Sequence, residues 1–269
     1  MKNEITFEDF KRYYPYAPTA LAIKECVRLN SMRDLDCPGP ILDVGCGDGL
    51  FATLAFGGQE VWGIDIDGNE GRRAQASQAY SHVILADVTQ ARLPQGFFGS
   101  CVANCSLEHV PDIQAAGRAI VSALKPGGVF YTFLPAKDWA DALMVAKTLR
   151  KLGLESMAGT ITEAINSIFK HRHLEDAAGW RKIFESAGFE VERVDPIGST
   201  ASTMAFEAFL LPSLAGRLNK ALTGRWTLIP GLRQLGAVPV YAMVKALLAG
   251  NPDQIPTAEY LLVARRPAK

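Results

Sequence analysis

The sequence predicts an α/β protein with a doubly wound, mostly parallel β-sheet and helices on both faces. Apolar runs of strand length alternate with helical patterns between residues 40 and 134, an order typical of parallel strands joined by crossover helices. The first run leads into a glycine-rich turn, and the second and third runs each end in an aspartate, Asp65 and Asp87. Because the carboxyl ends of parallel strands meet at one edge of a sheet, these residues are expected to form one site.

The first strand is predicted at residues 41–44, and the turn Gly45-Cys46-Gly47-Asp48-Gly49 follows it directly. A sharp strand-to-helix turn requires backbone angles that a Cβ disfavours, and a glycine also lets a ligand lie against the main chain. Residues 51–56 are apolar and are predicted to begin a helix, whose first N–H groups would face that ligand.

Four further strands are predicted in this part of the chain, at residues 60–65, 82–87, 101–106 and 129–134. An acid at the end of the second strand of a nucleotide-binding fold typically accepts hydrogen bonds from ribose hydroxyls. Asp65 has that position. The turn Leu124-Lys125-Pro126-Gly127-Gly128 precedes the last of these strands.

This succession of motifs resembles the class I S-adenosylmethionine-dependent methyltransferases of the small-molecule branch, in particular those of type 11. The resemblance runs from about Tyr14 to Leu134 and returns at residues 187–191, Ala-Gly-Phe-Glu-Val. It implies a Rossmann-like seven-stranded sheet in which the last strand, predicted at residues 259–265, lies antiparallel beside the sixth, predicted at 189–194. It also implies S-adenosyl-L-methionine as the cofactor and S-adenosyl-L-homocysteine as its product.

We expect one methyltransferase domain over residues 1–269, with helical lid insertions. Within it, the pattern indicates a helical segment at 1–37, a cofactor-binding core at 38–135, a helical lid-like insertion with a further helix at 136–187, and an apolar, basic insertion at 197–256. The first of these insertions, at 136–187, begins with a helical pattern that runs from Asp138 to Phe169.

The stretch of residues 197–250 contains one acid, Glu207, and five bases, Arg217, Lys220, Arg225, Arg233 and Lys245. It contains no uninterrupted apolar run of the roughly 20 residues that a membrane-spanning helix needs. Three interpretations remain open: a lid over an apolar substrate, a surface that rests on anionic lipid, or extra helices packed on the sheet.

Charge and cysteine content restrict the partners and the location. Lys plus Arg and Asp plus Glu both number 28, so the net charge is zero and no global basic field indicates a nucleic-acid partner. The five cysteines form no Cys-x-x-Cys pair, and the amino terminus has no signal-peptide core. We therefore expect reduced thiols and a cytoplasmic protein. A further expectation is that residues 197–250 contact the inner face of the membrane peripherally. The sequence leaves the oligomeric state open.

The resemblance assigns cofactor contacts along the carboxyl edge of the sheet. Gly45, Gly47 and Gly49 would lie against the methionine and ribose portions, with Cys46 as a small residue between them. Asp65 would accept from the ribose hydroxyls, and its neighbour Ile66 would pack on adenine. Asp87 would accept from the adenine amino group, while the backbone N–H of Val88 would reach the ring.

The same resemblance places three further contacts at the methionine end. Asp43 would help to hold the amino group, and Asn104 and Cys105 would lie beneath the methionine moiety. Tyr14 would reach the cofactor carboxylate. For Asp43 a structural bond to the loop, and for Tyr14 a packing role, are equal alternatives.

His109 is the candidate general base, since a histidine with a pKa near 6.5 can take a proton from a hydroxyl or amine close to neutral pH. The motif Ser106-Leu107-Glu108-His109-Val110 resembles the ubiquinone-pathway O-methyltransferases, whose Glu-x-x-Glu-His pattern can bind a divalent metal. Cys105 stands where that pattern has its first acid, so no metal is expected here. The alternative for Glu108 and His109 is a structural hydrogen bond at the start of a helix.

His171 and His173 alternate across Arg172 ahead of a predicted helix at 174–187. They are candidates for lining a substrate pocket, and the alternative is a polar entry to that helix.

Together these features predict an enzyme that transfers a methyl group by in-line displacement to a small, hydrophobic acceptor: a lipid, polyketide, quinone-like compound, terpenoid or lipid-linked sugar. The alternatives are an NAD(P)-dependent oxidoreductase, which the position of Asp65 also permits, and a non-enzymatic protein that binds the cofactor or a membrane. Against the oxidoreductase, Leu50 stands where the dinucleotide motif has its third glycine.

Overall fold

The computed structural model describes residues 5–249 and 258–268. Residues 1–4 of the predicted amino-terminal segment and 250–256 of the predicted insertion therefore lie outside the described residues. The chain divides into two compact units. One unit comprises residues 1–33, 138–168 and 197–258, and the other comprises 34–137, 169–196 and 259–269. We call them the helical unit and the sheet unit.

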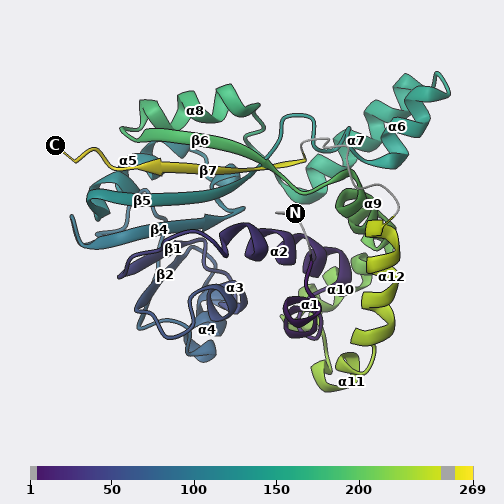
Figure 1. Ribbon diagram of the computed structural model, residues 1–269, viewed down its shortest axis with the longest axis horizontal. Helices are drawn as coiled ribbons and strands as arrows, with labels where there is room; N and C mark the ends of the chain where they lie inside the picture. Colours follow the sequence, from purple (N-terminus) through teal and green to yellow (C-terminus); the bar gives the residue numbers. More distant parts are fainter. Residues whose placement is uncertain (1–4, 250–257, 269) are drawn as a thin grey trace. The chain divides into compact units, whose positions relative to one another are not determined.

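The sheet unit contains a seven-stranded sheet in the order β3-β2-β1-β4-β5-β7-β6 (Figure 1). Its strands are β1 (Ile41–Val44), β2 (Val61–Asp65), β3 (His82–Leu85), β4 (Phe98–Asn104), β5 (Leu124–Pro135), β6 (Glu190–Ile197) and β7 (Glu259–Arg265). The strands from β1 to β5 pair in parallel, whereas β7 runs antiparallel to β5. The predicted fold class is confirmed, including the antiparallel last strand.

The helices of the sheet unit lie on both sides of the sheet (Figure 1). They are α3 (Leu50–Ala55), α4 (Gly68–Ser77), α5 (Ile113–Ala123) and α8 (Ala177–Ser186), and a short 3₁₀ turn, η1 (Leu107–His109), follows β4. The core between the sheet and α5 and α8 is apolar and aromatic, with Phe130, Trp180 and Phe184 fully buried. The strand β1 is buried along its whole length, as expected of a central parallel strand covered on both faces.

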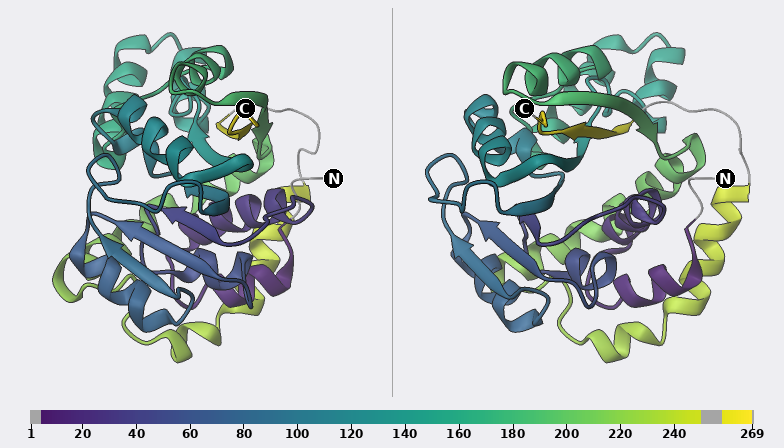
Figure 2. Two further views of the ribbon diagram at one scale, coloured as in Figure 1. Left: turned by 90° about the vertical axis from the view of Figure 1, so that its left-hand side faces the viewer. Right: turned by 60° about the vertical axis from the view of Figure 1, so that its left-hand side comes forward.

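The helical unit gathers three segments that are far apart in the sequence. Its helices are α1 (Phe7–Tyr13), α2 (Thr19–Met32), α6 (Met144–Lys151), α7 (Glu155–Phe169), α9 (Thr200–Ala208), α10 (Leu210–Thr223), α11 (Pro230–Gln234) and α12 (Ala237–Ala249). Figure 2 shows α1 beside α12, and both α10 and α12 pack with the α9 region. Arg233 joins two of these segments, because its guanidinium donates to the carbonyl oxygens of Tyr14 and Ala17.

One expectation about helix boundaries is corrected by the structure. The helical pattern from Asp138 to Phe169 is not one helix: α6 ends at Lys151 and α7 begins at Glu155. Gly153 lies between them with a φ of 74°, a left-handed conformation that glycine adopts without steric penalty. None of the described helices is long and apolar enough to cross a membrane.

Candidate functional site

The sheet unit contains a cavity of about 280 Å³ at the carboxyl edge of its sheet. Residues at the carboxyl ends of β1 and β2, and in the segments that follow β1, β2, β3 and β4, line it: Val44, Gly45, Ile64, Asp65, Ile66, Ala86, Asp87, Val88, Cys105, Ser106, His109, Val110 and Pro111. Seven predicted site residues thus meet around one space: Gly45, Asp65, Ile66, Asp87, Val88, Cys105 and His109. Crevices at this edge are the usual ligand sites of open α/β sheets.

The glycine-rich turn has the left-handed backbone that its sequence predicts. Gly45, Gly47 and Gly49 have φ values of 74°, 54° and 82°. A Cβ on Gly45 would overlap the side chain of Ser106, coming within 2.7 Å of its Oγ. A Cβ on Gly49 would lie 2.6 Å from Ser77 Oγ, whereas one on Gly47 would meet no atom within 4 Å. The turn therefore needs glycine for conformation at all three positions and for space at the first and last.

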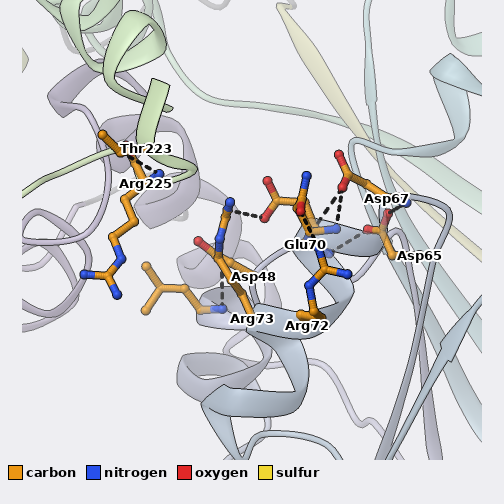
Figure 3. A network of polar contacts seen from close by, with 11 residues as sticks. Asp48, Asp65, Asp67, Glu70, Arg72, Arg73, Thr223 and Arg225 are labelled. Atoms are coloured by element: carbon orange, nitrogen blue, oxygen red, sulfur yellow. Dashed lines mark hydrogen bonds and ion pairs between the residues drawn. The ribbon is translucent and has the colours of Figure 1, made fainter. Parts of the chain in front are cut away.

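Asp65 ties the end of β2 to the glycine turn. Its Oδ2 accepts from the backbone N–H of Gly47 at 2.8 Å, and its Oδ1 accepts from the N–H of Asp67 at 2.8 Å. A carboxylate has about four acceptor sites, so each oxygen keeps capacity for a second donor in the cavity. The helix cap is the neighbouring Asp67, which accepts from Asn69 and Glu70 at the start of α4 (Figure 3).

Two residues after β3 and one after β2 form the next part of the lining. Asp87 Oδ1 accepts from both the backbone N–H and the hydroxyl of Thr89 at 2.8 Å, which holds the carboxylate in a tight turn. Val88 is buried beside it, whereas Ile66 is 75% exposed. An exposed isoleucine at the rim of a cavity offers a flat apolar contact for a ring.

Asp43 is almost fully buried, with 2% of its surface exposed, and does not line the cavity. Its Oδ2 accepts from the hydroxyl of Tyr80 at 2.7 Å, and the same hydroxyl lies 3.3 Å from the carbonyl oxygen of Cys46. Burial and the Asp43 carboxylate raise the pKa of Tyr80, so the phenol keeps its proton and remains a donor. Tyr80 was not among the predicted site residues, because nothing in its local sequence pairs it with β1.

The Tyr80 bond leads to a stability prediction. We expect Tyr80→Phe to lower the free energy of unfolding by about 1.5–3 kcal/mol, the usual value for a hydrogen bond to a charged group. Tyr16→Phe is the control, since Tyr16 is exposed and should change stability by less than about 0.5 kcal/mol. Urea unfolding of both variants measures the difference. Equal stabilities would show that the Tyr80 hydroxyl does not support the loop.

The segment after β4 turns sharply beneath the cavity. Cys105 has a φ of 47°, an uncommon conformation for a residue with a Cβ. Ser106 Oγ donates to the carbonyl oxygen of Val44 at 2.6 Å and so joins this turn to the end of β1. Asn104 ends β4 without lining the cavity. Cys46 is buried away from it, and burial, followed by the Asp43 carboxylate, raises the pKa of its thiol, so the thiol behaves as a neutral packing group.

His109 reaches the cavity from η1. Its Nδ1 lies 3.0 Å from the carbonyl oxygen of Lys170. Because a carbonyl only accepts, Nδ1 carries the proton in the neutral ring and Nε2 carries the lone pair. Burial lowers the pKa of His109, so the ring is neutral near pH 7 and able to take a proton. The buried Glu108 lies 3.7 Å from Nε2 through its Oε1.

His171 and His173 lie against η1 and do not line the cavity. The ring of His171 stacks on that of His109, with centroids 5.6 Å apart. His173 lies 2.9 Å through its Nε2 from the carbonyl oxygen of Val110. Both histidines thus contact the turn that carries His109, and their predicted contact with a substrate stays a prediction. The sequence showed them only as an alternating pair.

Tyr14 belongs to the helical unit, where its ring stacks on Phe10 and lies beneath the guanidinium of Arg233 at 4.2 Å. Within the residues that the structure describes, no group of three or more His, Cys, Asp and Glu side chains is placed to share a metal ion.

The residues around the cavity fit an adenosyl nucleoside. The fit rests on three features of this chain: a turn whose first glycine has no room for a Cβ, a carboxylate at the end of β2, and an exposed apolar side chain beside a second carboxylate. Donors from a ribose diol and an exocyclic amine match the acceptors of Asp65 and Asp87.

A family described as "Methyltransferase domain" matches residues 20–194. The chain belongs to this family, the class I S-adenosylmethionine-dependent methyltransferases. The family match supports a methyltransferase over the dinucleotide-dependent dehydrogenase that the position of Asp65 had left open.

Individual relatives match over stretches of different length. An uncharacterised methyltransferase of Mycobacterium tuberculosis is 40% identical over 91 residues, which cover 33% of this chain and 46% of that protein. A sterol 24-C-methyltransferase of Gibberella zeae is 27% identical over 256 residues, covering 85% of this chain and 65% of that protein. The chain thus spans about half to two thirds of the length of these relatives.

Solved structures share the fold. Phosphoethanolamine N-methyltransferase 2 of Haemonchus contortus, in complex with S-adenosyl-L-methionine, superposes with a TM-score of 0.52 at 17% identity, covering 93% of this chain and 54% of that one.

Proposed function

We propose that this methyltransferase binds S-adenosyl-L-methionine in the cavity of its sheet unit and methylates a small, hydrophobic acceptor. One observation carries the proposal: Gly45, Asp65 and Asp87 come from three different strand ends and line the same cavity. When bound, the cofactor supplies a methyl group that its sulfonium makes electrophilic.

Different residues of the chain would hold different parts of the cofactor. Asp65 would accept from the ribose hydroxyls, and Asp87, with the N–H of Val88 and the apolar surface of Ile66, would hold the adenine. The glycine turn would let the methionine portion lie on the backbone, over Cys105. Asn104 and Asp43 would lie behind the cavity lining at this end. Positioning of this kind supplies much of the rate of a displacement reaction.

Support for a hydrophobic acceptor comes from two sources. The Gibberella zeae relative carries the name of a sterol methyltransferase, and the cavity lining contributes Val44, Ile64, Val110 and Pro111 beside the polar groups. We propose that the acceptor is met in the cytoplasm at the inner face of a membrane. All five cysteines are free thiols, as expected of a reducing compartment.

Isothermal titration calorimetry with S-adenosyl-L-homocysteine and with NADH tests the nucleoside site directly. Saturable binding of the first, and none of the second, is the expected result. Incubation of a cell extract with a labelled methyl donor and the protein would then identify the acceptor by its label. Absence of binding to S-adenosyl-L-homocysteine would contradict the proposal.

His109 is proposed to take the proton from the acceptor, because Nε2 carries its lone pair and the side chain lines the cavity. We expect His109→Gln to lower label incorporation by about 10²–10⁴-fold, the usual contribution of a general base. His82→Gln is the matched control, since His82 is exposed and lies outside the cavity. Unchanged incorporation in His109→Gln would remove the base from the proposal.

The same variant has a readout that needs no acceptor. The pKa of His109 is lower in the folded protein, so protons bind more readily to the unfolded chain, where the pKa is about 6.5. Its contribution to stability is present above that value and is lost as the pH falls from about 6.5 through the lower folded-state pKa. Urea unfolding should show a smaller acid-side loss of stability in His109→Gln than in wild type. Equal losses would contradict the assigned pKa direction.

A further inference from the structure

The helix α10 has its apolar side turned outward. Leu211, Leu214, Leu218 and Leu222 recur at spacings of three and four residues, which places them on one face of the helix. All four are exposed, Leu211 and Leu222 by 77% each and Leu218 by 64%. No residue of α10 is buried.

The opposite face of α10 makes the contacts with the rest of the helical unit. Ser213 accepts through its Oγ from the backbone N–H of Ala20 at 3.2 Å. A Cβ on Gly216 would lie 2.9 Å from the ring of Pro18, so the helix approaches α2 closely on that side. A surface helix ordinarily buries its apolar stripe and exposes its polar one, and α10 does the reverse.

The chain that follows α10 adds to this exposed apolar surface. Leu228 and Ile229 precede α11, while Leu232 lies within it and Leu235 follows it; all four are more than half exposed. We call these four residues and the four leucines of α10 the leucine surface. Exposed apolar residues that gather on one helix face mark an interaction site more often than scattered residues do.

The charge around the leucine surface has a single sign. Residues 208–249 contain no Asp or Glu and five bases. Arg233 points inward, toward the carbonyl oxygens of Tyr14 and Ala17, which leaves the bases at positions 217, 220, 225 and 245. The acid just before this stretch, Glu207, accepts from the backbone N–H groups of Met144 and Val145 and is held there. Two copies of such a surface would repel each other, whereas an anionic lipid surface would attract it.

We propose that the leucine surface docks on an anionic lipid bilayer, with the α10 stripe at the level of the headgroups and the bases of α10 and the turn after it, Arg217, Lys220 and Arg225, facing lipid phosphates. Helices with an apolar face and basic flanks bind in this way without crossing the membrane. The proposal rests on the proposed function in that a hydrophobic acceptor would be met at the same membrane.

Co-sedimentation with vesicles tests the docking in the full chain. We expect the protein to pellet with vesicles of equal parts phosphatidylcholine and phosphatidylglycerol, to pellet weakly with pure phosphatidylcholine, and to be released by added salt, since the attraction of surface charges is screened. The double variant Leu218→Ser, Leu222→Ser should bind the anionic vesicles at least about tenfold more weakly than wild type, because it removes exposed apolar area from the stripe. Arg225→Gln should weaken binding about fivefold.

Leu152→Ser is the matched control, as Leu152 is equally exposed but lies outside residues 208–249; it should bind vesicles like wild type. The docking is refuted if wild type fails to pellet with anionic vesicles, or if the double variant pellets equally well. Light scattering that shows a dimer, dissociated by the double variant, would instead assign the surface to a second copy and overturn the proposal. Calorimetry with S-adenosyl-L-homocysteine on the same variants tests the nucleoside site separately, because none of the substituted residues lines the cavity.

Discussion

Gly45→Ala is expected to lower the free energy of unfolding by about 2–5 kcal/mol. Two costs combine: a left-handed backbone costs a residue with a Cβ about 1–2 kcal/mol, and the new methyl group would overlap Ser106, with overpacking adding about 1–3 kcal/mol. Ser106 cannot easily move aside, because its hydroxyl donates to the carbonyl oxygen of Val44. Urea unfolding measures the loss.

Gly47→Ala separates the two costs. Gly47 has a similarly positive φ of 54°, but a Cβ there meets no atom within 4 Å. This variant should lose only the conformational cost of about 1–2 kcal/mol. If the two variants lose equal stability, the close approach of Gly45 to Ser106 does not constrain the turn.

Asp65→Ala is expected to weaken binding of S-adenosyl-L-homocysteine by about 1–3 kcal/mol, roughly 5- to 150-fold. The variant removes the carboxylate proposed to accept from the ribose. It also frees the N–H of Gly47, which Asp65 holds at 2.8 Å, so the glycine turn loses part of its fixed shape. Calorimetry measures the change in affinity.

Asp67→Ala is the matched control for this experiment. It removes the same charge two residues away, but Asp67 does not line the cavity and instead caps α4. We expect it to cost about 1 kcal/mol of stability, as the loss of a helix cap does, and to leave the affinity within about twofold. An affinity that falls equally in both variants would indicate a general charge effect, and an unchanged affinity in Asp65→Ala would remove its assigned role.

Much of the sheet could be predicted from the sequence, because the signals are local. Alternating apolar runs, the glycine turn, the aspartate that ends β2 and the aspartate that follows β3 specify strands and their carboxyl ends within a few residues. The topology of parallel strands then brings Gly45, Asp65 and Asp87 to one edge, whatever the intervening helices contain. Boundaries were less well predicted, as the break at Gly153 between α6 and α7 shows.

Contacts between distant segments could not be predicted in this way. Asp43 could be singled out as polar on a buried strand, but its partner Tyr80 lies 37 residues away and has no pattern that links the two. His109, His171 and His173 were visible as separate candidates. Only the fold shows that one lines the cavity while the other two contact its turn.

The sequence by itself determined the α/β class, the family and the residues at the strand ends, since these depend on backbone conformation and on the apolar period of short segments. The tertiary structure alone decided which side of α10 faces outward and which three segments form the helical unit. The physical reason is that an amphipathic pattern specifies that a helix has an apolar face, not what covers it: that depends on packing against chain that is remote in sequence.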